Sequence, residues 1–425
     1  MTRICVYEDA VVENLEPATL TRPMTEVFAG TSRILDKFLR LFNPTTWGLW
    51  LRPEMVSLAK CLYPAVPIND PSWLAEDEVI LVNARWLPPQ TLTLAPDARV
   101  ARCEDTPVII RLARNQLSEL DQHWPLHLDR LISSLPTQSV PGTVVRFPWD
   151  LIAANEELIV AEAPNWFGNR MTRSPLNAVI LNGDEHNLYL DADTELEGPI
   201  VMDTRQGPVI VDQGVQIRSF SRIEGPCYIG RQAQIFSARI GRGTTIGPGC
   251  RIGGEVEATI FQGWSNKYHD GFVGHSWIGE WVNIAAGVQI SDLRHDYKPV
   301  PMEHRGRRQD TGLLKLGALI GDHTKLGLGV LVNTGSKFGI FCSVLPWAGY
   351  APNVIPSFCQ LVHGELRPCH DLAELLAIAS RVMLRRGREL SPELSDLYRQ
   401  VYLRSALERL SRTTAVSKWA LRAGA

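Results

Sequence analysis

The feature that most constrains this 425-residue chain is an apolar residue that recurs at every sixth position. Six does not match the helical period of about 3.6 residues, and the period-two alternation of an antiparallel sandwich is missing. Glycines between the apolar positions, as in IGRGTT and LGLGVL, permit tight corners. The pattern therefore predicts a hexapeptide-repeat β-helix, whose coils bury their central column only against neighbouring coils. Its predicted positions are Val211, Ile217, Ile223, Ile229, Ile235, Ile240, Ile246, Ile252, Phe272, Ile278, Ile284, Ile290, Leu314, Ile320, Leu326, Val332, Phe338 and Val344.

The parts before and after the repeat have different patterns. Residues 1–185 are expected to form a Rossmann-like α/β domain, because apolar strand candidates at 3–7 and 78–83 flank a helical pattern at 31–42. Strand, helix and strand in this order favour a parallel layer. The β-helix is assigned to 186–367. Residues 368–425 are predicted to form a helical tail that covers the open end of the β-helix or packs on a neighbouring subunit.

Composition excludes several classes of protein. The formal charge is −3 and no Lys/Arg block dominates, which argues against a nucleic-acid binder. The eight cysteines are scattered without a Cys-x-x-Cys pair, which fits reduced thiols better than a zinc site or a disulfide framework. No signal peptide is recognisable, and no run approaches the ~18 apolar residues of a membrane span. A cytoplasmic protein with no membrane partner is expected.

One polar stretch breaks the repeat, at residues 265–270 within 253–297. We expect this segment to project between complete coils without disturbing the column, and to form the functional site. It contains His269, and a histidine is suited to proton transfer near neutral pH. Metal binding by His269, His275 and His295 is a less favoured alternative, because their spacing does not place them on one corner.

Four short sequence motifs in and around this stretch carry a family resemblance: GGEV at 253–256, SNKYHDGFVG at 265–274, IGEWVNIAAG at 278–287 and NTG at 333–335. ENLEPATLTRP at 13–23 adds to them. The chain resembles the bifunctional N-acetylglucosamine-1-phosphate uridyltransferase/glucosamine-1-phosphate acetyltransferases, and is closer still to a variant sugar nucleotidyltransferase branch of them. The resemblance spans most of residues 1–360. It implies a left-handed parallel β-helix, a homotrimer, and a role in the biosynthesis of a nucleotide sugar of the UDP-N-acetylglucosamine type.

The resemblance also implies acetyl transfer from acetyl-CoA to an amino sugar phosphate such as glucosamine-1-phosphate. By position, His269 is the general base, and Lys267, Asn283 and Asp292 contact the acceptor. A backbone N–H near Ala285 and Ala286 supports the thioester oxygen of the bound cofactor. The chain departs from the family at Phe272, Glu257, Ala285 and Asp292, where the family commonly has tyrosine, lysine, glycine and asparagine. These departures concern the acceptor more than the reaction type.

The first domain resembles sugar-1-phosphate nucleotidyltransferases, which implies UTP or dTTP as substrate and Mg²⁺ if the domain is active. Thr21, Arg22 and Asn83 match its nucleotide-binding segments. The Gly-rich phosphate loop is missing, however, and the strand-end Asn-Gly-Asp, whose aspartate holds Mg²⁺, reads Asn-Ala-Arg at 83–85. Asp150 and Asp184 are candidate replacement ligands.

Two alternative functions stay open. One is a nucleotidyltransferase whose β-helix is only a scaffold. The other is a non-catalytic trimer that binds a sugar nucleotide.

Overall fold

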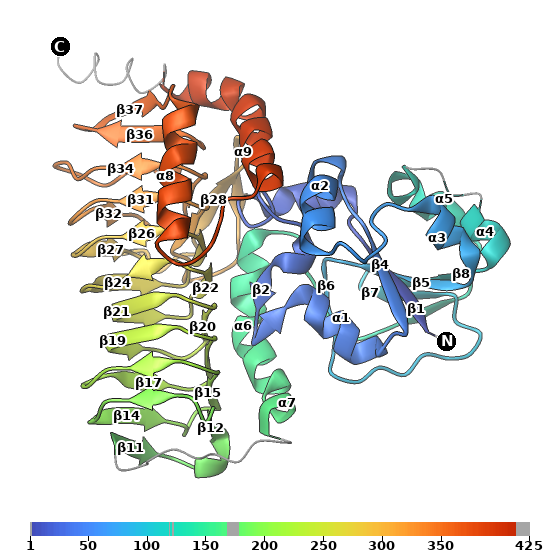
Figure 1. The fold of residues 1–425 in the computed structure, drawn as a ribbon, viewed down its shortest axis with the longest axis horizontal. Coiled ribbons are helices and arrows are strands. Elements are labelled where there is room, and N and C mark those ends of the chain that lie inside the picture. Colours follow the sequence, from blue (N-terminus) through green and yellow to red (C-terminus); the bar gives the residue numbers. More distant parts are fainter. Residues whose placement is uncertain (1, 119, 121–122, 168–177, 414–425) are drawn as a thin grey trace. The chain divides into compact units, whose positions relative to one another are not determined.

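The computed structural model describes residues 2–118, 120, 123–167 and 178–413, which form two compact units. The first contains residues up to 27 and 32–150, and the second contains 28–31 and the chain from 151 onward. Figure 1 shows an α/β sheet in the first unit, and stacked coils with flanking helices in the second. The predicted fold class is confirmed. The boundaries expected at 185 and 367 stay predictions.

The first unit is built on a six-stranded mixed sheet in the order β4-β1-β5-β8-β7-β9. Its first strand is parallel to both of its neighbours, β4 and β5, as the sequence predicts. β8 is antiparallel to β5 and β7, so the sheet is mixed beyond the predicted parallel strands. β7 and β8 are joined by only two residues, too few for the crossover that a parallel pair needs. The strands are β1 (Arg3–Tyr7), β4 (Thr46–Trp50), β5 (Val79–Asn83), β7 (Val100–Cys103), β8 (Thr106–Leu112) and β9 (Thr137–Ser139).

Short helices and one small antiparallel pair complete the first unit. β6 (Trp86–Leu87) pairs with β10 (Thr143–Val144). One apolar cluster combines Cys5 and Tyr7 of β1 with Leu81 of β5 and Ile110 of β8. The helices are α1 (Ile34–Phe42), α2 (Pro53–Leu62), α3 (Pro71–Glu76), α4 (Arg114–Ser118) and α5 (Leu128–Ile132).

The second unit is a parallel β-helix whose strands pair coil upon coil. One face is a nine-stranded sheet, and the other strands form a larger sheet over the remaining faces. The nine strands are β12 (Leu188–Leu190), β15 (Val209–Val211), β18 (Cys227–Ile229), β20 (Thr244–Ile246), β22 (Ile260–Gly263), β25 (Trp277–Glu280), β30 (Ala318–Ile320), β33 (Ser336–Phe338) and β35 (Val354–Ile355). The larger sheet includes β11 (Val179–Asn182), β14 (Ile200–Asp203), β17 (Arg222–Glu224), β19 (Gln234–Ile240), β21 (Arg251–Glu257), β23 (Asn266–Lys267), β24 (Gly271–Gly274), β26 (Asn283–Ile284), β27 (Val288–Ile290), β31 (Lys325–Leu326), β32 (Leu331–Val332), β34 (Ser343–Val344) and β36 (Cys359–Val362).

The predicted column of apolar residues is present in the core of the coils, with two exceptions. Phe272 is only half-buried, and its neighbour Val273 takes the inward position, paired with Val256 and Ile290. Leu314 is 57% exposed. It precedes the coil that restarts at β30, after an inserted hairpin of β28 (Pro301–His304) and β29 (Arg307–Asp310).

The polar stretch at 265–270 does not interrupt the coils, so this expectation was wrong. Asn266 and Lys267 form β23, which pairs with β21 before it and β26 after it. Lys267 lies beside Ile252 in this register, and it therefore takes an inward position that other coils give to an apolar side chain. The repeat is hidden in the sequence because the inward residue is a lysine.

Two segments pack along the β-helix. α6 (Pro148–Glu162) contributes Asn155, whose amide donates to the Gly243 carbonyl and to the Thr245 hydroxyl, both at 2.9 Å. Asn155 also accepts the Gly30 N–H at 2.7 Å, so residues 28–31 are held against the same coils. Phe28 stacks on Tyr228 at 5.8 Å between ring centroids.

The C-terminal helices, α8 (Leu372–Leu384) and α9 (Pro392–Arg404), lie along one corner of the β-helix. Asp371 caps α8 by accepting the Glu374 N–H, and Ser391 caps α9 by accepting the Leu394 N–H. The corner is a ladder of stacked rings with left-handed backbone: Trp264, Trp281, His323, Phe341 and Phe358. Tyr398 of α9 meets Phe341 edge-on, and Arg388 lies 4.6 Å from the Trp264 ring. The tail thus packs along the side of the coils.

Candidate functional site

Lys267 anchors the corner that carries His269. Its side chain is fully buried, and its ammonium donates to the carbonyl oxygens of Gly253 at 2.7 Å and His269 at 3.1 Å. Burial lowers the pKa of Lys267 to about 8. Glycine is needed at 253, because a Cβ there would lie closer than 3.0 Å to the Tyr268 carbonyl oxygen. GGEV and SNKYHDGF are therefore two halves of one packed corner, and contact of Lys267 with a phosphate would require its side chain to leave this position.

His269 lies on the surface of this corner. Its side chain is exposed, and its ring meets the edge of Tyr268 at 4.9 Å between centroids. Tyr268 in turn packs on Phe236 of β19 at 4.1 Å. The carbonyl of Asp270 accepts the Gly287 N–H at 3.2 Å, which ties the corner to the next coil. The imidazole is thus presented to solvent by a backbone held from both sides.

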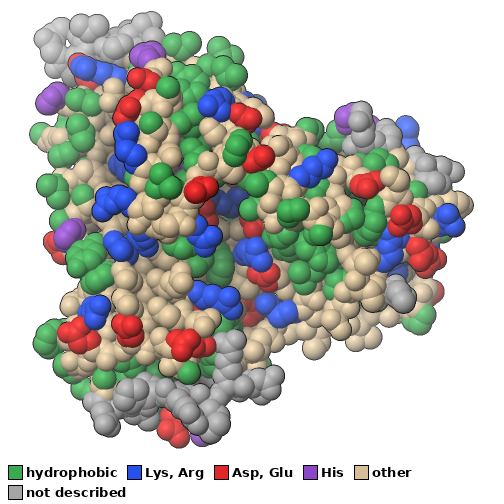
Figure 2. All heavy atoms as spheres, viewed as in Figure 1, with side chains coloured by type: hydrophobic (Ala, Val, Ile, Leu, Met, Phe, Trp, Pro, Cys, Tyr) green, Lys and Arg blue, Asp and Glu red, His purple; other side chains and the backbone are tan. Residues whose placement is uncertain are grey.

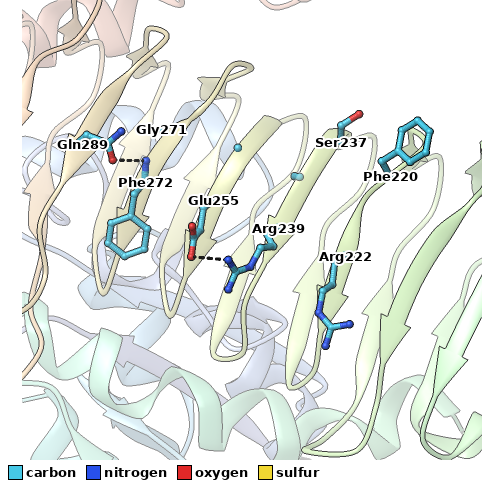
Figure 3. A pocket seen from close by; sticks show the side chains of 10 residues that line it. Phe220, Arg222, Ser237, Arg239, Glu255, Gly271, Phe272 and Gln289 are labelled. Atoms are coloured by element: carbon cyan, nitrogen blue, oxygen red, sulfur yellow. Dashed lines mark hydrogen bonds and ion pairs between the residues drawn. The ribbon is translucent and has the colours of Figure 1, made fainter.

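A hollow of about 530 Å³ lies beside this corner on the broad face of the coils. Figure 3 shows its side chains rising from successive strands. Arg239 of β19 pairs with Glu255 of β21 at 3.6 Å, and Gln289 accepts the Phe272 N–H at 3.1 Å. The lining residues are Phe220, Arg222, Ser237, Ala238, Arg239, Gly254, Glu255, Gly271, Phe272 and Gln289.

A second hollow of about 270 Å³ shares Phe272 and Gln289 with the first and contains Asp292. Asp292 is buried, and its Oδ2 lies 2.7 Å from Nδ1 of His275. The lining residues are Phe272, Gln289, Ser291, Asp292, Leu293, Leu331, Val332 and Tyr350. Asp292 thus lies in a hollow, as a contact to an acceptor requires, but a histidine holds it in place.

The other predicted residues of the β-helix are spread over neighbouring coils. Asn283 accepts a hydrogen bond from Asn266 at 2.9 Å, and neither it nor His269 lines these two hollows. The Ala285 N–H donates to the Leu326 carbonyl at 3.1 Å. Because Gly287 donates to Asp270, the predicted oxyanion support from this corner would have to come from the N–H of Ala286.

In the first unit, a closed ion pair lies where β1 and β5 end. Arg85 donates from Nε to Asp9 Oδ1 at 2.7 Å and from its terminal nitrogen to Oδ2 at 2.5 Å. Its other nitrogen donates to the Val145 carbonyl at 2.9 Å. Asn83 donates to Asp9 at 2.9 Å and accepts the Arg85 N–H at 2.9 Å.

These residues do not fit Mg²⁺. A hard divalent cation needs several oxygen ligands, and here a buried guanidinium already neutralises the carboxylate. Asp150 accepts the N–H groups of Arg146 and Phe147 instead, and Asp184 caps a short turn and pairs with His186. In the described part of the chain, no three His, Cys, Asp or Glu side chains gather as a metal site would require.

Thr21 and Arg22 are buried beside a second ion pair. Arg52 donates to Glu8 at 2.9 Å and to the carbonyl of Thr19 at 2.9 Å. Arg22 donates to the Ala18 carbonyl at 3.4 Å and its own carbonyl accepts from Arg52. The structure brings this segment to Glu8, and Asn83 to Asp9, so both groups lie just after β1.

The sequence analysis missed Arg222 and Arg239, and it considered His275 only as a possible metal ligand. The two arginines lie on the outward positions of β17 and β19, next to inward isoleucines, and repeat-based register could have placed them on one face. His275 could not be paired with Asp292 without knowing how the coils stack. On the face drawn in Figure 2, side chains of both charge signs are interspersed. Among the described residues, no helix is long and apolar enough to cross a membrane.

Comparison with known proteins gives matches to both predicted activities. Residues 4–170 match the family model for sugar nucleotidyl transferases. A bifunctional sugar-1-phosphate nucleotidylyltransferase/acetyltransferase of Sulfurisphaera tokodaii is 38% identical over 94 residues, 22% of this chain and 23% of that protein. The bifunctional protein GlmU of Methanocaldococcus jannaschii is 35% identical over 95 residues, 22% of each chain. The matched stretches thus cover less than a quarter of these two relatives.

A third relative, an uncharacterized acetyltransferase YaiX of Escherichia coli, is 26% identical over 181 residues, which is 40% of this chain and 76% of that protein. These relatives and the family match support the family predicted from the motifs. The chain is similar to the bifunctional nucleotidylyltransferase/acetyltransferases, and its residues 4–170 are similar to the sugar nucleotidyl transferases.

Proposed function

We propose that the β-helix transfers an acetyl group from acetyl-CoA to the amine of an amino sugar phosphate of the glucosamine-1-phosphate type. The observation that carries this proposal is the corner at 267–271, where a buried lysine fixes the backbone, a histidine is exposed at 269, and Gly271 lines the larger hollow. The similarity to named acetyltransferases supports the same reaction.

The chemistry assigns one step to His269. The acceptor amine must lose a proton as its nitrogen attacks the thioester carbon, and His269 accepts that proton. The C–S bond then breaks, and the thiolate of CoA takes up a proton to leave as the thiol. The N–H of Ala286 supports the oxygen on which negative charge develops. Acetyl-CoA is a substrate in this scheme, and Asn283 is a proposed contact to the acceptor.

Arg222 and Arg239 are the proposed binding groups for the acceptor phosphate. Both line the larger hollow. The Arg222 side chain is 36% exposed and pairs with Asp203 and Glu224, and that of Arg239 is 66% exposed and pairs with Glu255. A guanidinium suits a phosphate because its donors match two phosphate oxygens. This assignment replaces Lys267, whose ammonium is held by two carbonyl groups inside the coil.

A homotrimer is part of the proposal, because the predicted site residues do not meet within one chain. Side chains near the hollows are apolar and exposed, including Phe220 at 77% and Tyr350 at 59%. A neighbouring copy that packs against them would bring a second surface to His269. The molar mass in solution, measured by light scattering, tests this part.

The test of the reaction is His269→Ala, with His295→Ala as a matched control on an exposed loop. We expect His269→Ala to lower the release of CoA thiol with glucosamine-1-phosphate by at least about 100-fold, while the oligomer stays intact. The control should keep wild-type turnover. Unchanged turnover in His269→Ala would remove the histidine from the mechanism, and no turnover by the wild type would remove the acetyl transfer itself.

Nucleotidyl transfer is the second proposed function, and the family match of residues 4–170 favours it. We assign no metal-dependent step to the end of β1 and β5, because Arg85 occupies Asp9 there. Release of pyrophosphate from UTP or dTTP with a sugar-1-phosphate tests this function. Binding of a sugar nucleotide without pyrophosphate release would favour the non-catalytic alternative.

A further inference from the structure

Asp292 is a largely buried carboxylate without a Lys or Arg partner among the described residues. Its side chain is 10% exposed. The nearby cations are paired elsewhere: Lys315 with Glu257 at 3.5 Å, and Arg294 with Asp296 at 2.6 Å. A carboxylate in such surroundings favours the approach of a positive charge, because water no longer compensates it fully.

His275 fixes the direction in which this carboxylate points. Nδ1 of His275 lies 2.7 Å from Oδ2 of Asp292. The backbone of His275 is itself held, since its N–H donates to Glu257 and its carbonyl accepts from Gly317, both at 2.9 Å. The Asp292 carbonyl accepts the Leu316 N–H at 2.8 Å. Both partners are therefore fixed to adjacent coils before any ligand arrives.

The residue before the histidine is a glycine for a packing reason. A Cβ at Gly274 would lie closer than 3.0 Å to Asp292 Oδ2 and to the Phe272 ring. Any larger residue at 274 would push the carboxylate or the aromatic ring out of place. Phe272 and Asp292 line the same hollow of about 270 Å³. The small size of Gly274 therefore allows the Phe272 ring and the Asp292 carboxylate to lie in it together.

We propose that Asp292, positioned by His275, binds the protonated amine of the acceptor and makes the site selective for an amino sugar over its hydroxyl analogue. The inference rests on the proposed acetyl transfer. In it, His275 is a positioning residue: its Nδ1–H holds one carboxylate oxygen and leaves the other for the ammonium group. One proton leaves the bound ammonium to solvent, which frees the nitrogen lone pair, and His269 takes the second proton as the C–N bond forms. A neutral asparagine at 292 would bind an amine and a hydroxyl with similar strength, whereas a carboxylate distinguishes them by charge.

The test is equilibrium binding of glucosamine-1-phosphate and glucose-1-phosphate to the full-length chain, measured by calorimetry at pH 6.5, where the amine is protonated. We expect the wild type to bind the amino sugar more tightly by about tenfold or more, the usual effect of a charge-assisted hydrogen bond. Asp292→Asn should reduce this preference to about twofold or less, by the same reasoning. Asp310→Asn, the same change on the exposed carboxylate at the end of β29, should keep it.

The role of His275 needs a rescue experiment. His275→Ala should lower the preference about as much as Asp292→Asn does, whereas His275→Asn should restore most of it, because its amide can donate from the position of Nδ1. Equal binding of both sugars by the wild type, or an unchanged preference in Asp292→Asn, would overturn the inference. An unchanged preference in His275→Ala would remove its positioning role. Because binding is measured without acetyl-CoA, these results stand apart from the turnover assay of His269→Ala.

Discussion

Asp9 and Asp292 are both carboxylates that the fold has largely removed from solvent, but the chain surrounds them differently. Asp9 is 17% exposed and accepts two hydrogen bonds from Arg85, with further donors from Asn83 and the Val11 N–H. Asp292 is 10% exposed, and one of its oxygens is hydrogen-bonded to the ring of His275. Both oxygens of Asp9 accept hydrogen bonds from its own unit. At Asp292, His275 contacts one oxygen, and we propose that the other is available to a ligand.

The difference shows which carboxylate is available to a ligand. A saturated carboxylate would have to give up a guanidinium before it could bind a metal, and the buried guanidinium would then be left unpaired. An open carboxylate gains by binding a cation. A binding site can therefore be recognised by charged groups that lack a counter-charge within the fold, and not only by the types of residue present.

The largest expected effect follows from breaking the saturated pair. Asp9→Asn leaves the buried Arg85 without its counter-charge, and we expect it to lower the free energy of unfolding by about 3 kcal/mol or more. Urea unfolding followed by tryptophan fluorescence measures this. The matched control is Asp97→Asn on the exposed surface of the same unit, where a change within about 0.5 kcal/mol is expected. Wild-type stability in Asp9→Asn would mean that the pair is loose enough to yield to a metal.

A second effect concerns the buried cation of the β-helix. Burial lowers the pKa of Lys267 from 10.5 to about 8 in the folded chain, whereas the unfolded chain keeps the ordinary value. Between these values the unfolded chain binds more protons, so the stability that Lys267 contributes rises with pH across this window. We compare the unfolding free energies of the wild type and Lys267→Met. Between pH 7.5 and 10.5, the value for the wild type should rise by up to about 3 kcal/mol relative to that of the variant.

Lys267→Met must be compared with the wild type, because burial also lowers the pKa of Lys325 to about 8 and both chains share that contribution. Lys298→Met, at an exposed position, is the control and should show a constant difference from the wild type. A difference between wild type and Lys267→Met that does not change with pH would mean that the ammonium reaches water.

The regular part of the fold could be predicted from the sequence because the repeat is a local pattern. Ile278, Ile284 and Ile290 follow from spacing alone, and they lie in the core as expected. The pattern failed at Lys267 and Phe272, where the inward position is polar or shifted by one residue. Apolar periodicity does not detect a buried lysine, because its burial depends on two carbonyl groups that only the folded corner brings to it.

The candidate site was less predictable because it depends on contacts between coils. The motif located His269, but the pairing of His275 with Asp292 joins residues 17 positions apart on successive coils. The mixed sheet of the first unit was missed for a similar reason, since strand order follows from long-range pairing. The loss of a metal ligand at Arg85 was visible in the sequence, but its new partner, Asp9, was not.

The smallest expected effect is that of Asp292→Asn on stability, and it gives the most direct comparison between Asp292 and Asp9. Asp292→Asn is the same chemical change as Asp9→Asn at a carboxylate that is at least as buried, yet we expect its unfolding free energy to stay within about 1 kcal/mol of the wild type. The asparagine oxygen can still accept the hydrogen bond from His275, and no buried cation is left unpaired. Urea unfolding under the conditions used for Asp9→Asn gives a direct comparison. If Asp292→Asn unfolds as easily as Asp9→Asn, the carboxylate of Asp292 serves mainly to hold the coils together, and a loss of amine selectivity in this variant would reflect a disturbed fold. If Asp292→Asn is as stable as expected, its loss of amine selectivity results from the lost contact between the carboxylate and the ligand.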